Sequence, residues 1–82
     1  MNIPHELQDE FPSETQFIQL LTKTSHDFKR LVNRYDEVNR NIYRIETEQE
    51  PTVDEVLVAL KKERLGLKDE IARMLAKLER RM

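Results

Sequence analysis

The sequence has no cysteine and no tryptophan, and it contains a single glycine in 82 residues. Without cysteine the chain can form neither a disulfide, nor a thiolate nucleophile, nor a zinc site of the cysteine type. This absence fits a reducing compartment, so we expect a cytoplasmic protein. No apolar run approaches the ~20 residues that span a bilayer, so no membrane-spanning helix is predicted. Near the N-terminus, Glu6, Asp9 and Glu10 stand where a signal peptide would have an apolar core.

Charged and hydrophobic residues are the most abundant classes in the chain. They make up 37% and 38% of the chain, and the net charge is −2. A chain that is rich in charge and in helix-forming residues, but nearly free of glycine, is typical of long amphipathic helices. Its length allows one small domain with a limited core. The predicted fold class is therefore all-α.

The chain divides into two parts. Residues 1–12 form a short leading segment that can hold a brief helix. Residues 13–82 are predicted to form a helical hairpin, with one helix over about 13–48, a turn over about 49–52 and a second helix over about 53–81. These lengths favour two long antiparallel neighbours joined by a short connection.

Two capping boxes support these boundaries. Ser13 is followed three residues later by Gln16, and Thr52 is followed by Glu55. In such a box the hydroxyl and the longer side chain each accept a hydrogen bond from the other residue's backbone N–H. Pro51 marks the turn, because no proline or glycine interrupts the chain between Ser13 and Pro51.

Apolar residues recur in alternating steps of four and three along both predicted helices. In the first helix the row is Phe17, Leu21, Thr24, Phe28, Leu31, Tyr35, Val38, Ile42 and Ile45. In the second helix it is Val53, Leu57, Leu60, Arg64, Leu67, Ile71, Met74, Leu78 and Arg81. A sustained repeat of 3.5 residues is typical of a left-handed coiled coil. The two rows predict an antiparallel two-helix coiled-coil hairpin.

Flanking charges favour one register of this pair. Centring the turn on Pro51 places Arg34 opposite Glu70, and Asp27 opposite Lys77. A slip of one heptad would place Asp27 opposite Glu70, and the two acids would repel. Surface pairs contribute only ~0–1 kcal/mol each. They can still choose between registers whose cores are of similar quality.

Further apolar residues lie beside the predicted seam, mostly near the open end of the hairpin. The candidate protein-contact surface consists of Ile18, Leu20, Val32, Leu75 and Met82. A two-helix hairpin has no third element to cover such a surface. Three occupants could cover it: the leading segment, through Ile3, Leu7 and Phe11; a second copy of the chain; or a different helical protein. The sequence predicts self-association into a bundle, with a dimer favoured.

Two stretches carry a family resemblance, LKKERLGLKDEI at residues 60–71 and YDEVNRNI at residues 35–42. Both resemble the YdcH-like proteins, a family of small bacterial helical hairpins that is classed as a domain of unknown function. The likeness extends from Phe11 to about Leu75, and Tyr35 stands where the family often has histidine. The resemblance implies a helical hairpin with coiled-coil character. It brings no activity, cofactor or catalytic residue.

Arg64 is a polar core position, because it stands in the second apolar row where an aliphatic residue is expected. Its stem can pack in the seam while the guanidinium reaches solvent or an acid. A polar core residue also specifies register. A sharper interpretation is an arginine that binds an anion between helices. A small all-α enzyme with such a site is therefore kept as an alternative function.

No other pattern indicates chemistry. His5 and His26 have no second histidine at ligand spacing, and the chain has no glycine-rich phosphate loop or nucleophile motif. Carboxylates on exposed helix faces lack the pocket that would shift their pKa for acid–base catalysis. We therefore predict no enzyme activity, no metal site, no cofactor and no small-molecule substrate.

Short rows of basic residues leave one more alternative open. The rows are Arg30 with Arg34, Arg40 with Arg44, and Arg73 with Lys77 and Arg81. Such rows can line phosphates, but acids are interleaved with them and no aromatic platform accompanies them. A nucleic-acid-associated protein is the less favoured alternative. The predicted function is that of a non-catalytic protein that acts through self-association or protein binding.

Overall fold

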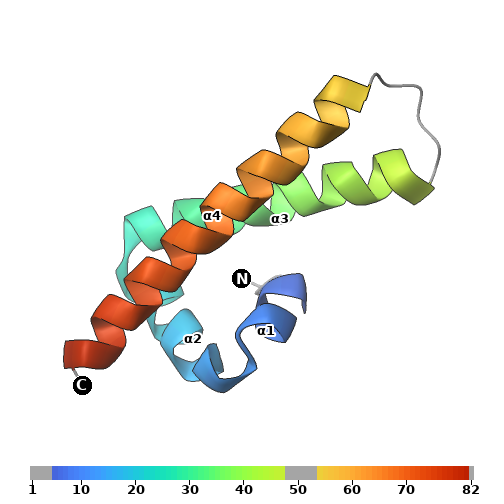
Figure 1. Ribbon diagram of the computed structural model, residues 1–82. Helices are drawn as coiled ribbons and strands as arrows, with labels where there is room; N and C mark the ends of the chain where they lie inside the picture. The colour runs from blue at the N-terminus through green and yellow to red at the C-terminus, as the bar shows by residue number, and fades with distance from the viewer. Residues whose placement is uncertain (1–4, 48–53, 82) are drawn as a thin grey trace.

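The computed structural model describes residues 5–47 and 54–81, and the regular structure in these ranges is helical throughout (Figure 1). The elements in chain order are α1 (His5–Glu10), the 3-10 helix η1 (Pro12–Glu14), α2 (Thr15–Thr24), α3 (His26–Thr47) and α4 (Asp54–Arg81). The molecule is elongated, with extents of 46 × 22 × 20 Å. The predicted all-α fold class is confirmed.

A break at Ser25 divides the first long helix. Ser25 has an extended backbone, with φ −122° and ψ 116°, between the end of α2 and the start of α3. Its hydroxyl accepts a hydrogen bond from the Phe28 N–H at 3.2 Å, which caps the first turn of α3. Thr24 Oγ1 donates to the Leu20 carbonyl at 2.8 Å, a side-chain bond of the kind that bends helices. The expectation of one uninterrupted helix over about 13–48 is therefore wrong at Ser25.

The helix starts also differ from the predicted caps. Ser13 lies inside η1, whose preceding residue is Phe11, and no side chain caps this turn. The first predicted capping box is therefore wrong. α4 begins at Asp54, close to the start predicted for the second helix. The predicted turn over about 49–52 and the cap residue Thr52 lie outside the described residues.

α3 and α4 pack against each other, and α4 crosses α3 on its return from the linker (Figure 1). One charge pair across this contact lies one heptad away from the predicted register. Arg34 Nε and Nη2 donate to the two carboxylate oxygens of Glu63, at 2.5 and 2.8 Å. Asp27, for its part, pairs with Arg30 on its own helix. The predicted pairing of Arg34 with Glu70 is therefore wrong.

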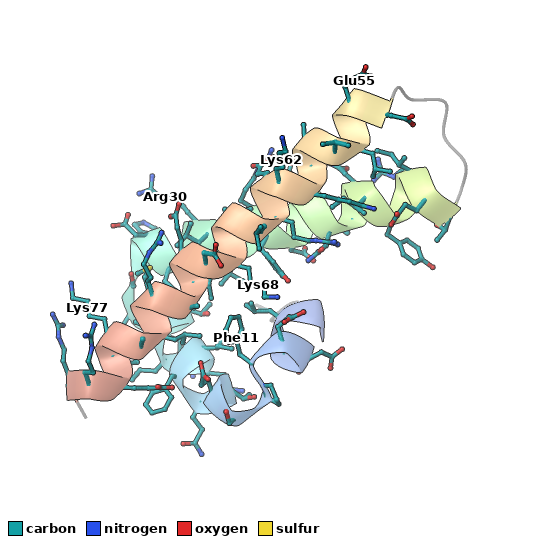
Figure 2. The ribbon with its side chains drawn as sticks, viewed as in Figure 1. Phe11, Arg30, Glu55, Lys62, Lys68 and Lys77 are labelled. Atoms are coloured by element: carbon teal, nitrogen blue, oxygen red, sulfur yellow. The ribbon has the colours of Figure 1, made fainter. Side chains whose placement is uncertain are left out.

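Buried side chains from all four α-helices form one core cluster. Its members are Leu7, Ile18, Phe28, Val32, Tyr35, Ile71 and Leu75. Leu7 is 0% exposed, although it belongs to the short leading segment. Phe11 packs against the same cluster from its edge (Figure 2). Full burial of a leucine side chain stabilises by roughly 1.5–3 kcal/mol, so the leading segment is an integral part of this small core.

The half of the hairpin near the linker is thinner. Between Asp54 and Glu70, α4 has no buried residue, whereas Ile71 and Leu75 further along the helix are fully buried. α1 and α2 lie beside the other half of α4 and leave the linker end uncovered (Figure 1). Apolar side chains of α4 near the linker are therefore partly exposed.

Gly66 offers a direct test of the helical environment in α4. A Cβ added at Gly66 would meet no atom within 4 Å, so alanine fits without strain. We expect Gly66→Ala to raise the free energy of unfolding by about 1 kcal/mol, because alanine favours the helix and restricts the unfolded chain. Urea denaturation followed by circular dichroism measures this change. The control Ala76→Gly, at an exposed site on the same helix, should lower the free energy of unfolding by a similar amount. If Gly66→Ala destabilised the protein instead, the added Cβ would be meeting other atoms, which would contradict the open space around Gly66.

Candidate functional site

The predicted contact surface lies mostly inside the chain. Ile18, Val32 and Leu75 are 0%, 1% and 0% exposed, so they are core residues and do not form an exposed contact surface. Leu20 remains 40% exposed. Met82 lies outside the described residues. The structure therefore brings three of the five predicted residues together, but it buries them.

Two features that the hydrophobic repeat does not show explain this burial. The break at Ser25 redirects α2, so that Ile18 joins side chains of α3 and α4 in the core. Leu7 of α1 then fills the same cluster, and Phe11 packs against it. Of the three occupants considered for this surface, the leading segment is the one that covers it in this structure.

A different apolar row is exposed on the outer side of α4. Val58 and Leu65 are 50% and 59% exposed. They lie seven residues apart, so two turns of helix place them on the same face. This row is separate from the predicted coiled-coil seam.

Charged residues surround Val58 in a regular pattern. Asp54 and Glu55 precede it by one turn, and Lys61 and Lys62 follow it by one turn. All four charged residues are exposed, and Glu55 and Lys62 project from the same side of α4 (Figure 2). Residues three and four positions apart are neighbours on a helix surface. We call these five residues the Val58 face.

A polar hollow lies where α1, α3 and α4 meet. It has a volume of about 330 Å³ and is lined by Glu10, Tyr35, Asn39, Lys61, Arg64, Leu65 and Lys68. Arg64 is half-buried, and its Nη1 donates to Asn39 Oδ1 at 3.2 Å. Asn39 is only 8% exposed, and its Nδ2 has no hydrogen-bond partner among the described residues. We call this site the Arg64 hollow.

The two lysines at the Arg64 hollow are held by acids. Lys61 Nζ lies 3.0 Å from Glu46 Oε2, and Lys68 Nζ lies 2.9 Å from Glu10 Oε2. Lys68 extends from α4 toward α1 (Figure 2). Its hydrogen bond to Glu10 raises the pKa of Lys68 above the ordinary lysine value, against a partial lowering by burial. Arg64 has no acid partner within the described part of the chain.

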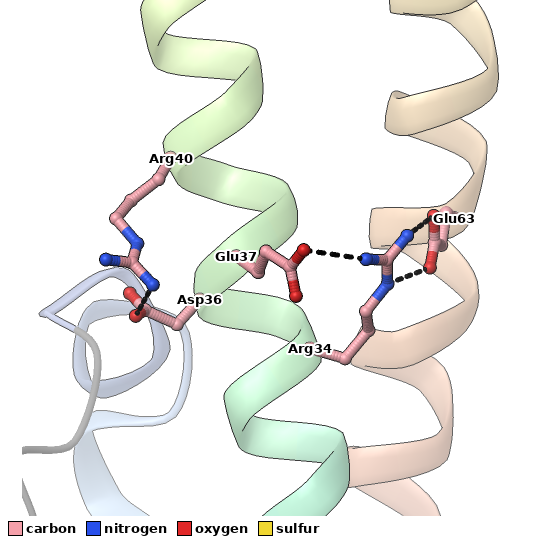
Figure 3. A network of polar contacts seen from close by, with 5 residues as sticks. All are labelled: Arg34, Asp36, Glu37, Arg40 and Glu63. Atoms are coloured by element: carbon pink, nitrogen blue, oxygen red, sulfur yellow. Dashed lines mark hydrogen bonds and ion pairs between the residues drawn. The ribbon is translucent and has the colours of Figure 1, made fainter.

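A second polar network joins α3 and α4 on an exposed face (Figure 3). Arg34 bonds to Glu63 of α4, and its Nη1 also lies 3.2 Å from Glu37 Oε1 on its own helix. The hydrogen bond between Arg34 and Glu63 raises the pKa of the arginine and lowers that of the glutamate. Each charged group stabilises the other, and the bidentate pair links the two helices across their crossing.

The basic rows of α3 are largely neutralised by acids. Arg30 pairs with Asp27, and Arg40 Nη2 lies 3.2 Å from Asp36 Oδ2 (Figure 3). Arg34 is engaged as described above. Binding of nucleic acid depends on basic side chains that are available to phosphates. The geometry of α3 therefore gives no support to the nucleic-acid alternative.

A larger hollow, of about 590 Å³, lies at the junction of α2 and α3. Its hydroxyls are already engaged, since Thr22 and Thr24 donate to backbone carbonyls and Ser25 caps α3. None of the described residues that line it has a buried polar atom without a hydrogen-bond partner, so nothing in this hollow indicates a bound ligand. Across residues 5–47 and 54–81, no three His, Cys, Asp or Glu side chains are grouped to hold a metal ion. Within the same ranges, no helix is long and apolar enough to cross a membrane.

The sequence pattern indicates Arg64 but misses most of the hollow around it. Lys61, Arg64 and Lys68 recur at helical spacing, so their common face could have been read from α4 alone. The coiled-coil register puts Asn39 on a flank and gives it no role. Glu10 could not be placed from sequence, because its position depends on how α1 folds back.

Together the fold and these sites define a small all-α protein whose polar and apolar features lie along one pair of packed helices. A family model described as protein of unknown function (DUF465) matches residues 28–75, more than half of the chain. The chain belongs to this family, which confirms the resemblance to the YdcH-like proteins. No curated protein and no solved structure matches it. The matched range includes Asn39 and Arg64, whereas Leu7 and Ile18 lie before it.

Truncating Leu7 tests whether α1 is part of the core. We expect Leu7→Ala to lower the free energy of unfolding by about 2–4 kcal/mol, because it leaves a cavity in the central cluster. Leu65→Ala, the same change at an exposed site of α4, should alter stability by about 0.5 kcal/mol or less. Thermal and urea unfolding at low protein concentration measure both variants. Equal effects of the two substitutions would show that α1 is not docked.

The pair formed by Arg34 and Glu63 predicts a pH dependence. Because the pKa of Glu63 is lowered in the folded chain, its stabilising effect is present above the ordinary glutamate pKa of 4.5. The effect is lost as the pH falls through the lower, folded pKa. Glu63→Gln should therefore be less stable than the wild type at neutral pH, with the gap closing on acidification. Urea titrations from pH 7 to about pH 3 measure the gap, and a gap that is constant with pH would rule out this pairing.

Proposed function

We propose that this protein is a non-catalytic interaction module, an antiparallel hairpin of α3 and α4 that self-associates through the Val58 face. The hairpin is closed by α1 and α2, so the apolar residues of its open end are already occupied. The observation that supports the proposal most is the charge pattern around exposed Val58, with two acids one turn before it and two lysines one turn after it.

This pattern is self-complementary when two α4 helices pair in opposite directions. A two-fold axis perpendicular to both helices brings Val58 against Val58 of the second copy. Asp54 then lies opposite Lys61 of the second copy, and Glu55 lies opposite Lys62. Each pairing occurs twice, so four complementary charge pairs surround one apolar contact. An interface of this kind is isologous and closes as a dimer.

The size of the Val58 face sets the expected strength of self-association. One helix face with one central valine is smaller than the interfaces of stable complexes, which bury about 1,200–2,000 Å². The association is therefore weak and reversible. Charge pairs at the rim mainly set orientation and exclude wrong partners. Lys61 also keeps its contact with Glu46, so the pair of Glu55 and Lys62 is the cleaner one to test.

A charge swap tests this arrangement. Lys62→Glu should abolish self-association, because each Glu55 would then face an acid of the second copy. The double variant Glu55→Lys with Lys62→Glu should restore it. The two positions lie about 10.5 Å apart along one helix, too far for a bond within the chain, so rescue reports a contact between copies. Sedimentation equilibrium from low-micromolar to millimolar concentration measures each variant.

Lys77→Glu is the matched control, since it makes the same charge change on an exposed site of α4 outside the Val58 face. It should leave association unchanged. Circular dichroism of all variants checks that helix content is retained. A wild type that stays monomeric at millimolar concentration would contradict self-association. An association that Lys62→Glu leaves intact would place the interface elsewhere.

A further inference from the structure

The Arg64 hollow has more hydrogen-bond donors than acceptors. An arginine side chain carries five N–H donors and accepts no hydrogen bond. Within the described residues, Arg64 bonds only to Asn39 Oδ1. The Nδ2 of Asn39 is buried and meets no acceptor there. A buried donor without an acceptor is destabilising, and the acceptors that line the hollow, such as the Glu10 carboxylate, leave Asn39 Nδ2 without a partner.

The charge of the lining has the sign that would attract a negatively charged acceptor. Lys61, Arg64 and Lys68 contribute three positive charges, whereas Glu10 at the hollow and Glu46 beside Lys61 contribute two negative charges, which leaves one net positive charge. Glu10 and Glu46 bond to the lysines and fix them at the hollow, but neither pairs with Arg64. Among the described residues only Asn39 bonds to the guanidinium, which leaves its other donors for an added acceptor.

We propose that the Arg64 hollow binds an oxyanion, the carboxylate or phosphate group of a small acidic molecule. The planar guanidinium of Arg64 binds two oxygens of such a group side by side. Asn39 Nδ2 is covered in the free structure, so it donates to the same anion after a movement of the Asn39 side chain, and it then gains the acceptor that it lacks. Lys61 and Lys68 add positive charge from the neighbouring turns of α4.

The dimensions fit a small ligand. A volume of about 330 Å³ lies at the lower end of the range for small-molecule sites, roughly 300–1,000 Å³. Tyr35 and Leu65 supply apolar surface beside the charged groups. The two sites share Lys61, which belongs to both the hollow and the Val58 face, but Arg64 and Asn39 lie outside the Val58 face.

Nuclear magnetic resonance of the full chain tests the proposal with sodium phosphate as the probe, at constant ionic strength. The signals to follow are the side-chain amide of Asn39 and the Nε–H of Arg64. Both should shift and saturate as phosphate is added. Sodium acetate in a parallel titration distinguishes the source: saturation by phosphate alone indicates a phosphoryl ligand, and saturation by acetate indicates a carboxylate.

Two variants remove the site in different ways. Arg64→Lys keeps the positive charge but removes the planar guanidinium. It should weaken phosphate binding by about ten-fold, which is the effect of losing one hydrogen bond to a charged group. Asn39→Asp places a carboxylate beside Arg64 and should abolish the phosphate shifts while helix content is retained. Arg73→Lys, at an exposed arginine of the same helix, is the control and should bind phosphate as the wild type does.

Either of two results would overturn the proposal. In the first, the Asn39 amide does not move while amides of exposed lysines shift in proportion to phosphate, which is non-specific screening. In the second, Arg64→Lys and Arg73→Lys bind phosphate with the same affinity as the wild type. Each result would mean that water alone satisfies the donors of the hollow.

Discussion

The burial of Leu7 is the contact on which the rest of the structure depends. Leu7 lies fully buried among side chains of α2, α3 and α4, and the ion pair of Glu10 with Lys68 holds α1 from outside. Without α1, only α2, through Ile18, would cover the edge that contains Val32 and Leu75. In a chain of this size every buried side chain is a large share of the core.

The sequence predicts what depends on local pattern. Composition predicts the all-α class, and the repeat of 3.5 residues correctly indicates Phe28, Tyr35 and Val38 as the buried face of α3. The break at Ser25 was missed because a serine cap competes with helix continuation by only ~1 kcal/mol, and tertiary packing decides the outcome. The predicted pairing of Arg34 with Glu70 was wrong because surface ion pairs are weak guides: Arg34 reaches Glu63 across a helix crossing that no periodicity describes.

The Val58 face and the Arg64 hollow both result from the uneven packing along α4. α1 and α2 cover one half of the helix and leave the half near the linker resting on α3 alone. That half exposes Val58 with its ring of charges, whereas the boundary between the halves holds the Arg64 hollow. Periodicity identified Arg64 as exceptional, but its partner Asn39 and the role of Glu10 depend on how the helices cross and how α1 folds back. Self-association and anion binding would therefore share one helix and Lys61, whereas Val58, Arg64 and Asn39 each serve one of the two.

The docking of Leu7 can be measured directly by nuclear Overhauser effects between methyl groups. A sample that mixes isotope-labelled and unlabelled chains separates contacts within one chain from contacts between chains. The structure predicts strong effects from the Leu7 methyls to those of Val32, Ile18 or Leu75 within the same chain. Absence of these effects, or their appearance only between chains, would contradict a core that the leading segment of the same molecule closes.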